Sequence, residues 1–317
     1  MSDTPSVTVA IPVLNEEAHL RECLDAVAAQ TYANVAEILV VDGGSIDRTR
    51  EIALSFPGVG VVSNPERIQA AGLNLALSRA KGDVFVRVDG HTVIETDYVE
   101  RCVDALLRTG ASYVGGSMVP VGTSGPERGI AVAMTSRLGV GPARFHHAGE
   151  RGGWADTAYL GAFWTDEARA IGGYDGGKAT NEDAEFAYRM GQRRGVWFDP
   201  TIRSRYQPRR DLLSLGRQFF RYGQGRAQTV RRHPRSLAPR QLAAPLLVLG
   251  LLSPWRRSVG AAYATVVLSR AALELRSDKR AAMTVAMCLP IMHLGWGVGF
   301  LSMMITGKRV RPSSELR

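Results

Sequence analysis

Short runs rich in β-branched residues alternate with stretches of helical spacing in the first part of this chain. The runs are Val7–Ile11, Glu37–Val41, Val59–Val62 and Val84–Val88. Between them lie Glu16–Ala29, Asp47–Phe56 and Ile68–Ala80, in which apolar residues recur at helical spacing. Because parallel strands need a crossover connection, this alternation predicts an α/β, Rossmann-like fold with a mostly parallel central sheet. Further along, Tyr113–Val119 is also strand-like, and a stretch rich in Gly and aromatic residues lies around Tyr159–Trp164.

Polar residues follow each of these four runs. They are Pro12–Glu16, Asp42–Ser45, Asn64–Arg67 and Asp89–His91. In an open parallel sheet, ligands bind outside the carboxyl ends of the strands, which is where these residues are expected. Any one of them could be a plain turn or a helix cap. Four in succession at one sheet edge favour a shared binding site.

Asp89 and His91 are candidate metal ligands. They are separated by one residue directly after a strand, so both can reach one divalent cation, Mn²⁺ or Mg²⁺. Such a cation would neutralise the charge that builds on a departing diphosphate. Imidazole suits these ions less well than a carboxylate does, and Asp-x-His by itself is a weak motif. The pattern therefore predicts a cation without deciding which one.

Asn181, Glu182 and Asp183 open an amphipathic stretch whose apolar face includes Phe186 and Met190. This spacing puts Asp183 in the first turn of a helix, on the face that packs inward. In one interpretation, Asn181 is the N-cap and the two acids complement the helix dipole. In the other, Asp183 is a general base that takes the proton from a hydroxyl group. The local pattern supports both interpretations equally.

The C-terminal part of the chain is basic and apolar. The formal net charge of +9 conceals an excess of acids over residues 1–200 and a strong excess of bases over residues 201–240. Ala281–Thr306 contains no Asp, Glu, Lys or Arg, and about 20 apolar residues suffice for a helix to cross a bilayer, so a membrane span is predicted there. Leu242–Ser253 and Val259–Leu268 are shorter and could form a re-entrant pair, an interfacial pair or one interrupted span.

Cysteine usage and charge also predict a location. Cys23, Cys102 and Cys288 have neither the number nor the spacing of a disulfide framework or a zinc site, so a reducing compartment is expected. Met1–Ser6 is polar and does not have the pattern of a signal peptide. Because a basic cluster precedes the apolar tail, the positive-inside tendency predicts a cytoplasmic-membrane protein whose N-terminal domain faces the cytoplasm.

Arg217–Arg226 interleaves cations with aromatic rings. Arg binds phosphate bidentately and aromatic rings favour the membrane interface, so the segment suits contacts with a diphosphate and with lipid headgroups. The alternative is a solvated basic helix that leads to the membrane.

A set of short motifs runs in order across most of residues 7–245. The set comprises Ile11–Glu16, Val41–Ser45, Asn64–Arg67, Gly72–Asn74, Val88–His91, Gly172–Asp175, Asn181–Asp183, Trp197–Pro200, Gln218–Arg226 and His233–Leu237. It resembles the family 2 inverting glycosyltransferases, and within them the succinoglycan-type exopolysaccharide glycosyltransferases. The resemblance implies a glycosyltransferase A-type fold with a C-terminal membrane-associated helical tail. It also implies a nucleotide-sugar-binding catalytic domain over residues 1–225 and a basic juxtamembrane segment with membrane-embedded helices over residues 226–317.

The resemblance implies roles for individual residues. On the donor side, the implied nucleotide-binding residues are Pro12, Glu16, Asp42, Arg67 and Asp89, of which Asp42 would bind the base, and the implied metal ligands are Asp89 and His91. On the acceptor side, Asp183 would be the catalytic base, and the implied acceptor or diphosphate contacts are Glu182, Gln218 and Arg221. His91 stands where many relatives have Asp, which leaves direct ligation by His91 open. Gly223 follows Tyr222 where processive synthases would show Trp directly after Arg221, so a single addition is favoured over processive synthesis.

The activity implied by the resemblance is inverting, metal-dependent transfer of a hexose from a nucleotide sugar, by default a UDP-sugar. The implied acceptor is a polyprenyl-linked saccharide in cell-surface or exopolysaccharide synthesis. A polyprenyl-phosphate monosaccharide synthase is the second candidate. A non-catalytic basic membrane protein that binds nucleic acid through residues 203–240 is the third. Because strand-exit carboxylates would repel phosphate without a metal, nucleic acid is not an expected partner.

Overall fold

The computed structural model of the chain describes residues 4–121, 125–147, 149–176, 181–206 and 211–307. Its internal contacts divide the chain into two compact units. Among the described residues, unit 1 comprises those within 4–119 and 143–206, and unit 2 comprises those within 120–142 and 211–307. The domain boundary expected after residue 225 falls inside a continuous helix, α9 (Leu212–Arg232).

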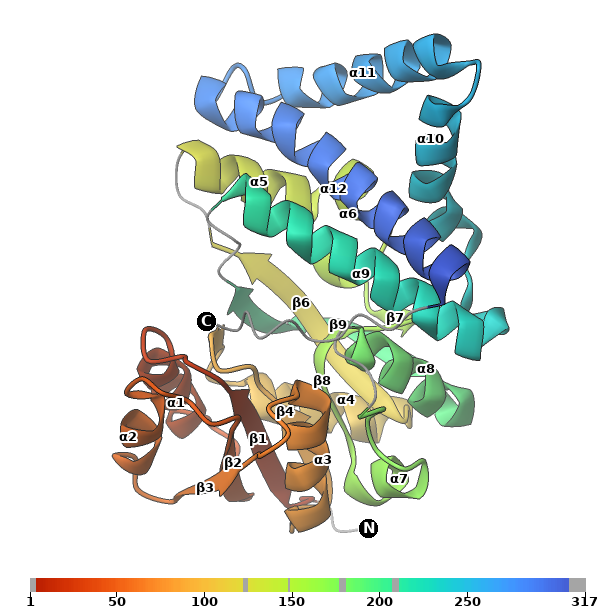
Figure 1. Cartoon of the computed structure of the whole chain (residues 1–317). Coiled ribbons are helices and arrows are strands. Elements are labelled where there is room, and N and C mark those ends of the chain that lie inside the picture. Colours follow the sequence, from red (N-terminus) through yellow and green to blue (C-terminus); the bar gives the residue numbers. More distant parts are fainter. Residues whose placement is uncertain (1–3, 122–124, 148, 177–180, 207–210, 308–317) are drawn as a thin grey trace. The chain divides into compact units, whose positions relative to one another are not determined.

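Unit 1 is built on a mixed, nine-stranded sheet whose first four strands are parallel (Figure 1). The order of these strands is β3 (Val59–Ser63), β2 (Val35–Asp42), β1 (Val7–Val13) and β4 (Val84–Arg87). The crossovers between them contain α1 (Leu20–Ala28), α2 (Thr49–Leu54) and α3 (Gln69–Arg79). The predicted α/β fold is therefore confirmed, with all four expected strands in place.

The rest of the sheet is largely antiparallel. Its strands are β8 (Tyr159–Trp164), β6 (Tyr113–Pro120), β9 (Val196–Tyr206), β5 (Thr92–Ile94) and β7 (Gly153–Ala155). The remaining helical elements of unit 1 are α4 (Tyr98–Thr109), the 3₁₀ turn η1 (Arg144–His146), α7 (Thr165–Ala170) and α8 (Glu182–Arg194). β8 runs antiparallel to β4, with Ala162 opposite Val86, so β8 begins at the sheet edge where β4 ends.

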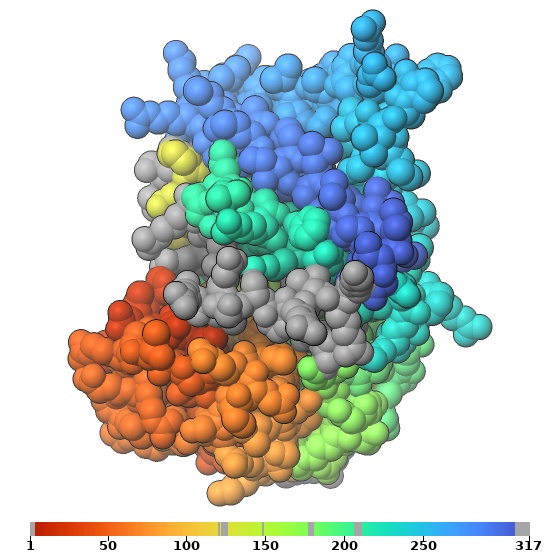
Figure 2. Space-filling view, in the orientation of Figure 1, coloured from red at the N-terminus to blue at the C-terminus, as the bar shows by residue number. Residues whose placement is uncertain are grey.

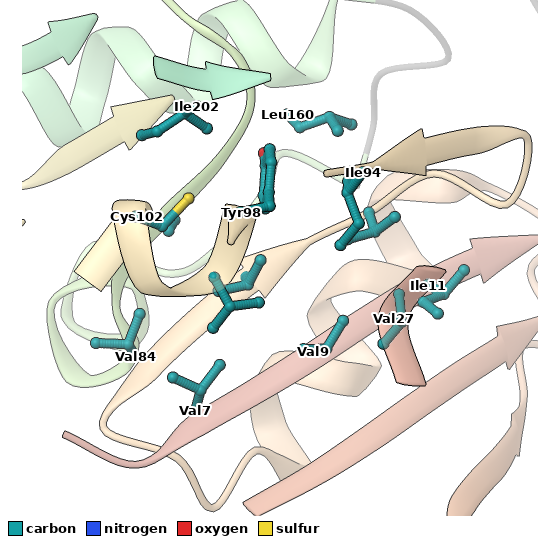
Figure 3. Close-up of a cluster of buried hydrophobic side chains, with 14 of the residues drawn as sticks. Val7, Val9, Ile11, Val27, Val84, Ile94, Tyr98, Cys102, Leu160 and Ile202 are labelled. Carbon is teal, nitrogen blue, oxygen red and sulfur yellow. The ribbon is translucent and has the colours of Figure 1, made fainter. Parts of the chain in front are cut away.

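Both faces of the sheet in unit 1 are covered by apolar side chains. Every position of β1 is buried. Val7, Val9 and Ile11 belong to one cluster, which α1 and α4 complete (Figure 3). Ala10 belongs to the cluster on the other face, which α3 and α8 complete. A strand that is buried on both faces reads as a continuous apolar run, which is why this strand was visible in the sequence.

Unit 2 is helical. Its elements are α5 (Gly125–Thr135), α6 (Arg137–Val140), α9, the 3₁₀ turns η2 (Pro234–Ser236) and η3 (Pro239–Leu242), α10 (Ala243–Leu252), α11 (Arg256–Ala272) and α12 (Lys279–Thr306). α12 packs closely against α9 through glycines. A Cβ on Gly223 would lie 2.0 Å from the carbonyl oxygen of Trp296, and one on Gly299 would lie 2.1 Å from that of Phe220. Glycine is therefore required at both positions for the two backbones to approach this closely.

Within the described part of the chain, α12 is the one helix that is long and apolar enough to cross a membrane. The apolar stretch before it forms two separate helices, α10 and α11. Both expose large apolar side chains near their ends: Leu252 is 78% exposed and Trp255, between the two helices, is 71% exposed. Side chains of α11, light blue in Figure 2, stand out at the surface. Exposed apolar side chains gathered on neighbouring helices are typical of a surface that contacts lipid or another protein.

Candidate active site

The loops after β1 and β2 are joined by hydrogen bonds. Asn15 has a φ of 55°. Its backbone N–H donates to Ser45 Oγ at 3.0 Å, and its side-chain oxygen accepts the backbone N–H of Ile46 at 3.0 Å. Asn adopts the left-handed conformation more readily than most residues, which explains why an Asn is found at this position of the turn. The bonds hold the exits of two adjacent strands together.

Asp42 is the last residue of β2 and is 4% exposed. Its Oδ1 accepts the backbone N–H of Ser45 at 2.9 Å and the Ser45 hydroxyl at 2.7 Å. Its Oδ2 lies 3.9 Å from Arg50 Nη1. An ionised carboxylate only accepts hydrogen bonds, so Asp42 presents an oriented acceptor at the strand exit.

The turn after β4 packs directly on the loop after β1. A Cβ on Gly90 would lie 2.8 Å from Val13 Cγ1 and 3.3 Å from Glu16 Cγ, so only glycine fits between the two loops without a shift. His91 Nδ1 lies 2.9 Å from Glu16 Oε1. Pro12, buried in β1, lies beside the same turn, with its carbonyl oxygen 3.6 Å from that Cβ position. The structure therefore brings together Pro12, Glu16 and His91, which the sequence analysis selected.

Asp89 is held by a buried arginine that the sequence analysis did not single out. Arg87 Nε donates to Asp89 Oδ1 at 2.8 Å and Arg87 Nη2 donates to Asp89 Oδ2 at 3.2 Å. Gln69 Nε2 also donates to Oδ1, at 3.2 Å. Burial favours the neutral carboxyl, but the guanidinium outweighs it and holds the pKa of Asp89 below its usual value. Asp89 is therefore an oriented, ionised carboxylate at neutral pH.

Glu182 and Asp183 begin α8, as the spacing predicted. Asn181 precedes them with a φ of 64°, and its side chain caps no backbone N–H of the helix. The interpretation of this segment as a plain capping motif therefore loses its main support. Asp183 is half-buried, and its Oδ1 accepts the backbone N–H of Ala184 at 2.7 Å. Glu182 is the more buried of the two acids, at 7% exposed.

Glu182 lies close to Arg87 as well. Its Oε1 is 3.8 Å from Arg87 Nη2. Burial raises the pKa of Glu182 to about 7, and the neighbouring Asp183 carboxylate acts in the same direction. Arg87 therefore lies between the carboxylate of Asp89 and the first residue of α8.

The turn before α8 is anchored to α3. The amide of Asn74 donates to the carbonyl oxygen of Tyr174 at 2.8 Å and accepts the backbone N–H of Tyr174 at 2.7 Å. Gly173 has a φ of 67°, and a Cβ there would meet the Asn74 side chain at 2.4 Å. The Tyr174 ring stacks on Phe186 of α8, with centroids 4.1 Å apart. Tyr174 is therefore held between α3 and α8.

Three of the predicted site residues lie outside this group of contacts. Arg67 follows β3, is exposed and has a φ of 58°, and its Cα lies 3.6 Å from the Cβ position of Gly43, beside the Asp42 turn. Gln218 and Arg221 lie in α9, which belongs to unit 2. There the Gln218 amide donates to the Tyr222 hydroxyl at 2.7 Å.

The side chains of Asp89 and His91 suit a divalent cation that is also held by the oxygens of a bound diphosphate. No group of three or more His, Cys, Asp and Glu side chains gathers at a metal-like spacing among the described residues. Asp89 and His91 supply one carboxylate and one imidazole, and Mg²⁺-type ions are commonly held by one or two protein groups together with phosphate oxygens and water. The Glu16 carboxylate on His91 Nδ1 is the partner that a metal-ligating imidazole usually has, with Nε2 as the ligand atom.

Comparisons with known proteins give a family match and related sequences. The sequence model of the family described as Glycosyl transferase family 2 matches residues 8–151. Succinoglycan biosynthesis protein ExoA from Rhizobium meliloti (strain 1021) is 33% identical over 321 residues, which cover 96% of this chain and 96% of that protein. A dolichyl N-acetyl-alpha-D-glucosaminyl phosphate 3-beta-D-2,3-diacetamido-2,3-dideoxy-beta-D-glucuronosyltransferase from Methanococcus voltae is 24% identical over 242 residues, 71% of this chain and 74% of that protein.

A solved structure shares the fold over nearly the whole chain. It is the mannosyltransferase PcManGT from Pyrobaculum calidifontis in complex with GDP-Man and Mn²⁺. The TM-score is 0.64 at 20% identity, and the match covers 97% of this chain and 89% of that one. The glycosyltransferase A-type fold expected from the sequence is thereby confirmed.

Proposed function

We propose that this chain, which belongs to glycosyl transferase family 2 and is a glycosyltransferase, moves a hexose from a nucleotide sugar to a lipid-linked saccharide with inversion of configuration. The product would serve exopolysaccharide or other cell-surface polysaccharide synthesis. One observation carries the proposal: unit 1 gathers the strand-exit residues Asp42, Asp89 and His91 and links Asp89 through Arg87 to the start of α8, which bears Asp183. A donor nucleotide and an acceptor hydroxyl can thus meet at one sheet edge.

The chemistry proposed for Asp183 is that of a general base. Its carboxylate takes the proton of the acceptor hydroxyl as that oxygen attacks the anomeric carbon of the donor. The bond between the anomeric carbon and the diphosphate oxygen breaks on the opposite side, so the nucleoside diphosphate leaves and the configuration inverts. Asp183 suits this role because it is ordered by the backbone of α8 and is still partly exposed to an incoming hydroxyl.

The donor is proposed to be a UDP-sugar held by the exits of β1, β2 and β4. Asp42 presents a buried acceptor to the N–H of the base, and Pro12, Glu16 and Arg67 would line the nucleotide. Asp89 and His91 would hold a divalent cation, Mn²⁺ or Mg²⁺, whose charge would offset that of the diphosphate. On His91, the Glu16 carboxylate fixes the tautomer that offers Nε2 as a ligand.

The acceptor is proposed to be a polyprenyl-linked saccharide at the cytoplasmic membrane, with the catalytic unit on the cytoplasmic side. α12 is long and apolar enough to reach across the membrane, and the relative from Methanococcus voltae is named for a dolichyl-phosphate-linked acceptor. Gln218, Arg221 and Glu182 are the residues proposed to contact the acceptor or the diphosphate. The Arg-rich α9 has the charge that such a phosphate-bearing lipid requires.

A transfer assay with the purified full chain tests this function. Nucleotide sugars on UDP and on GDP are offered with Mn²⁺ or Mg²⁺, together with either a polyprenyl-diphosphate-linked saccharide or bare polyprenyl phosphate. We expect a single sugar to be added to the lipid-linked saccharide from a UDP-hexose, with loss of activity on chelation of the metal. Exclusive use of bare polyprenyl phosphate would identify a monosaccharide-lipid synthase instead. Absence of transfer from every nucleotide sugar would overturn the proposed function.

Membrane attachment is tested separately by fractionation. We expect the full chain to stay with the membrane after washing with alkaline carbonate, because the exposed apolar side chains of α10–α12 would be in lipid. In inside-out vesicles, where the cytoplasmic face is outward, we expect added protease to digest unit 1. Release of the chain by high salt would mean that it binds only by charge. Protection of unit 1 in inside-out vesicles would reverse the proposed orientation.

A further inference from the structure

We propose that Arg87 is a positioning residue for sugar transfer, because its guanidinium joins the donor-side carboxylate of Asp89 to the turn of α8 that carries the catalytic base. The inference rests on the proposed function and deepens it. Arg87 itself touches neither sugar nor acceptor in this scheme; it acts through the two acids on either side of it.

The first argument is the place of Arg87 in the fold. It ends β4 after Val84, Phe85 and Val86, all of which are fully buried, and it is itself 4% exposed. A cation is costly in such a strand unless it is fully paired. A strand that only had to pack would carry an apolar residue here, as it does at the preceding positions. Packing of the core therefore does not explain why Arg is found at the end of this strand.

The second argument is the geometry of its contacts. The guanidinium forms a two-pronged pair with Asp89, at 2.8 and 3.2 Å, which sets the direction of that carboxylate as well as its charge. The nitrogen Nη2 of the same group lies 3.8 Å from Glu182 Oε1. Glu182 directly precedes Asp183 in α8, so a shift of Arg87 would act on the helical turn that bears Asp183.

The third argument is that the contacts of Arg87 with its neighbours are not all tight in the absence of substrate. Arg87 Nη1 and the Tyr174 hydroxyl are both buried, and neither makes a hydrogen bond of good geometry among the described residues, although the two side chains are close enough to interact. The Arg87–Glu182 distance of 3.8 Å is also longer than a hydrogen bond. Catalytic contacts are often long before the substrate binds and tighten in the complex. If the Asp89 carboxylate moves when substrate binds, a small movement of the guanidinium can therefore shift the first turn of α8 as well.

The experiment separates positioning from simple neutralisation of charge. Arg87→Lys keeps the positive charge but loses the planar fork. We expect it to keep the thermal stability of the wild type far better than Arg87→Met, and yet to lower kcat by ~10–100-fold, the range seen when a residue supporting an active-site ligand is removed. A Lys variant with wild-type kcat and wild-type donor KM would overturn the proposal.

A double-mutant cycle tests the link across to α8. Glu182→Gln has nearly the same shape as the wild type, so it avoids the folding risk of removing a buried cation. We expect the kcat losses of Arg87→Lys and Glu182→Gln to be non-additive in the double variant, because both disturb the same contact. Fully additive losses would show that Arg87 acts on Asp89 alone and would overturn the coupling. Arg108→Lys is the matched control, because Arg108 pairs with Asp199 at 2.7 Å in the same unit, and its kcat should be unchanged.

A binding measurement distinguishes failure of this inference from failure of the proposed function. Calorimetric titration with UDP and Mn²⁺ requires no transfer reaction. We expect Arg87→Lys to weaken UDP binding about tenfold by loosening Asp89, and Glu182→Gln, which keeps the pair between Arg87 and Asp89, to weaken it less. If the wild type transfers no sugar but this difference persists, the proposed function fails and the positioning of Asp89 by Arg87 stands. If the wild type is active and both variants bind and react like it, the inference alone fails.

Discussion

Replacing Asp183 with Asn is expected to lower kcat by ~10²–10⁴-fold, the usual contribution of a general base, while the affinity for the nucleotide sugar changes little. The amide keeps the shape of the side chain but cannot take a proton from the acceptor hydroxyl. Asp183 is half-buried and has no ion pair within 4.0 Å among those found in the described residues, so the free energy of unfolding should also change little. The measurement is steady-state transfer kinetics together with thermal melting.

The matched control for this change is Asp166→Asn. Asp166 also lies in the first turn of a helix, α7, where it is 94% exposed and pairs with Arg169 at 3.2 Å. If acids in the first turn of these helices served only the helix dipole, the two variants would behave alike. A kcat for Asp183→Asn equal to that of Asp166→Asn would remove Asp183 from the proposed mechanism.

Replacing Asp89 with Asn is expected to have two large effects at once. Activity should fall to background, because the donor side of the site loses its ionised carboxylate. Stability should fall by about 3–5 kcal/mol, because the buried Arg87 loses the carboxylate with which it is hydrogen-bonded and keeps only Glu182, at 3.8 Å. The combination differs from that expected for Asp183→Asn, which should leave stability almost intact. Activity and chemical denaturation are measured on the same preparations.

The stability part of this prediction depends on pH in a defined direction. The pKa of Asp89 is depressed in the folded state, so the pair with Arg87 contributes fully above the unfolded pKa of about 3.9 and is lost as the pH falls through the lower folded value. The stability difference between wild type and Asp89→Asn should therefore be constant near neutral pH and shrink in acid. A difference that grew on acidification would contradict the assigned ion pair.

Asp97→Asn is the control for the loss of an ion pair in general. Asp97 pairs with Arg101 at 2.6 Å, but both side chains are more than a third exposed. Solvent screens such a pair, so its loss should cost at most about 1 kcal/mol. Equal destabilisation by Asp97→Asn and Asp89→Asn would mean that the Arg87 pair is no stronger than a surface contact.

The parallel half of the fold could be predicted because each of its elements carries a local signal. The run Val7–Ile11 became β1 (Val7–Val13), and Ile68–Ala80 contains α3 (Gln69–Arg79). Strands buried on both faces and helices with one apolar face show their periodicity directly in the sequence. The polar strand exits followed from the same reasoning, because parallel strands must all end at one edge.

The antiparallel half could only be predicted in part. Tyr113–Val119 was visible as a strand-like segment, whereas Tyr159–Trp164, which forms β8, stood out only as a stretch rich in Gly and aromatic residues. Nothing local places β8 beside β4, which is far away in the sequence. The long strand β9 (Val196–Tyr206) has charged residues at several positions and lacks a clear alternation. Pairing between distant segments depends on the whole set of strands that compete for one edge, and no short stretch of sequence contains that information.

The amino-acid sequence alone determined the class of fold and predicted which residues form the candidate site, because periodicity and the order of motifs are properties of the chain itself. Only the tertiary structure decided that Arg87 pairs with Asp89 and reaches Glu182, and that Asn74 anchors the turn before α8. One signal for Arg87 was present, a charge at the end of an apolar strand. Its contact with Glu182 was not, since a side chain nearly one hundred residues away becomes a neighbour only when the core has closed.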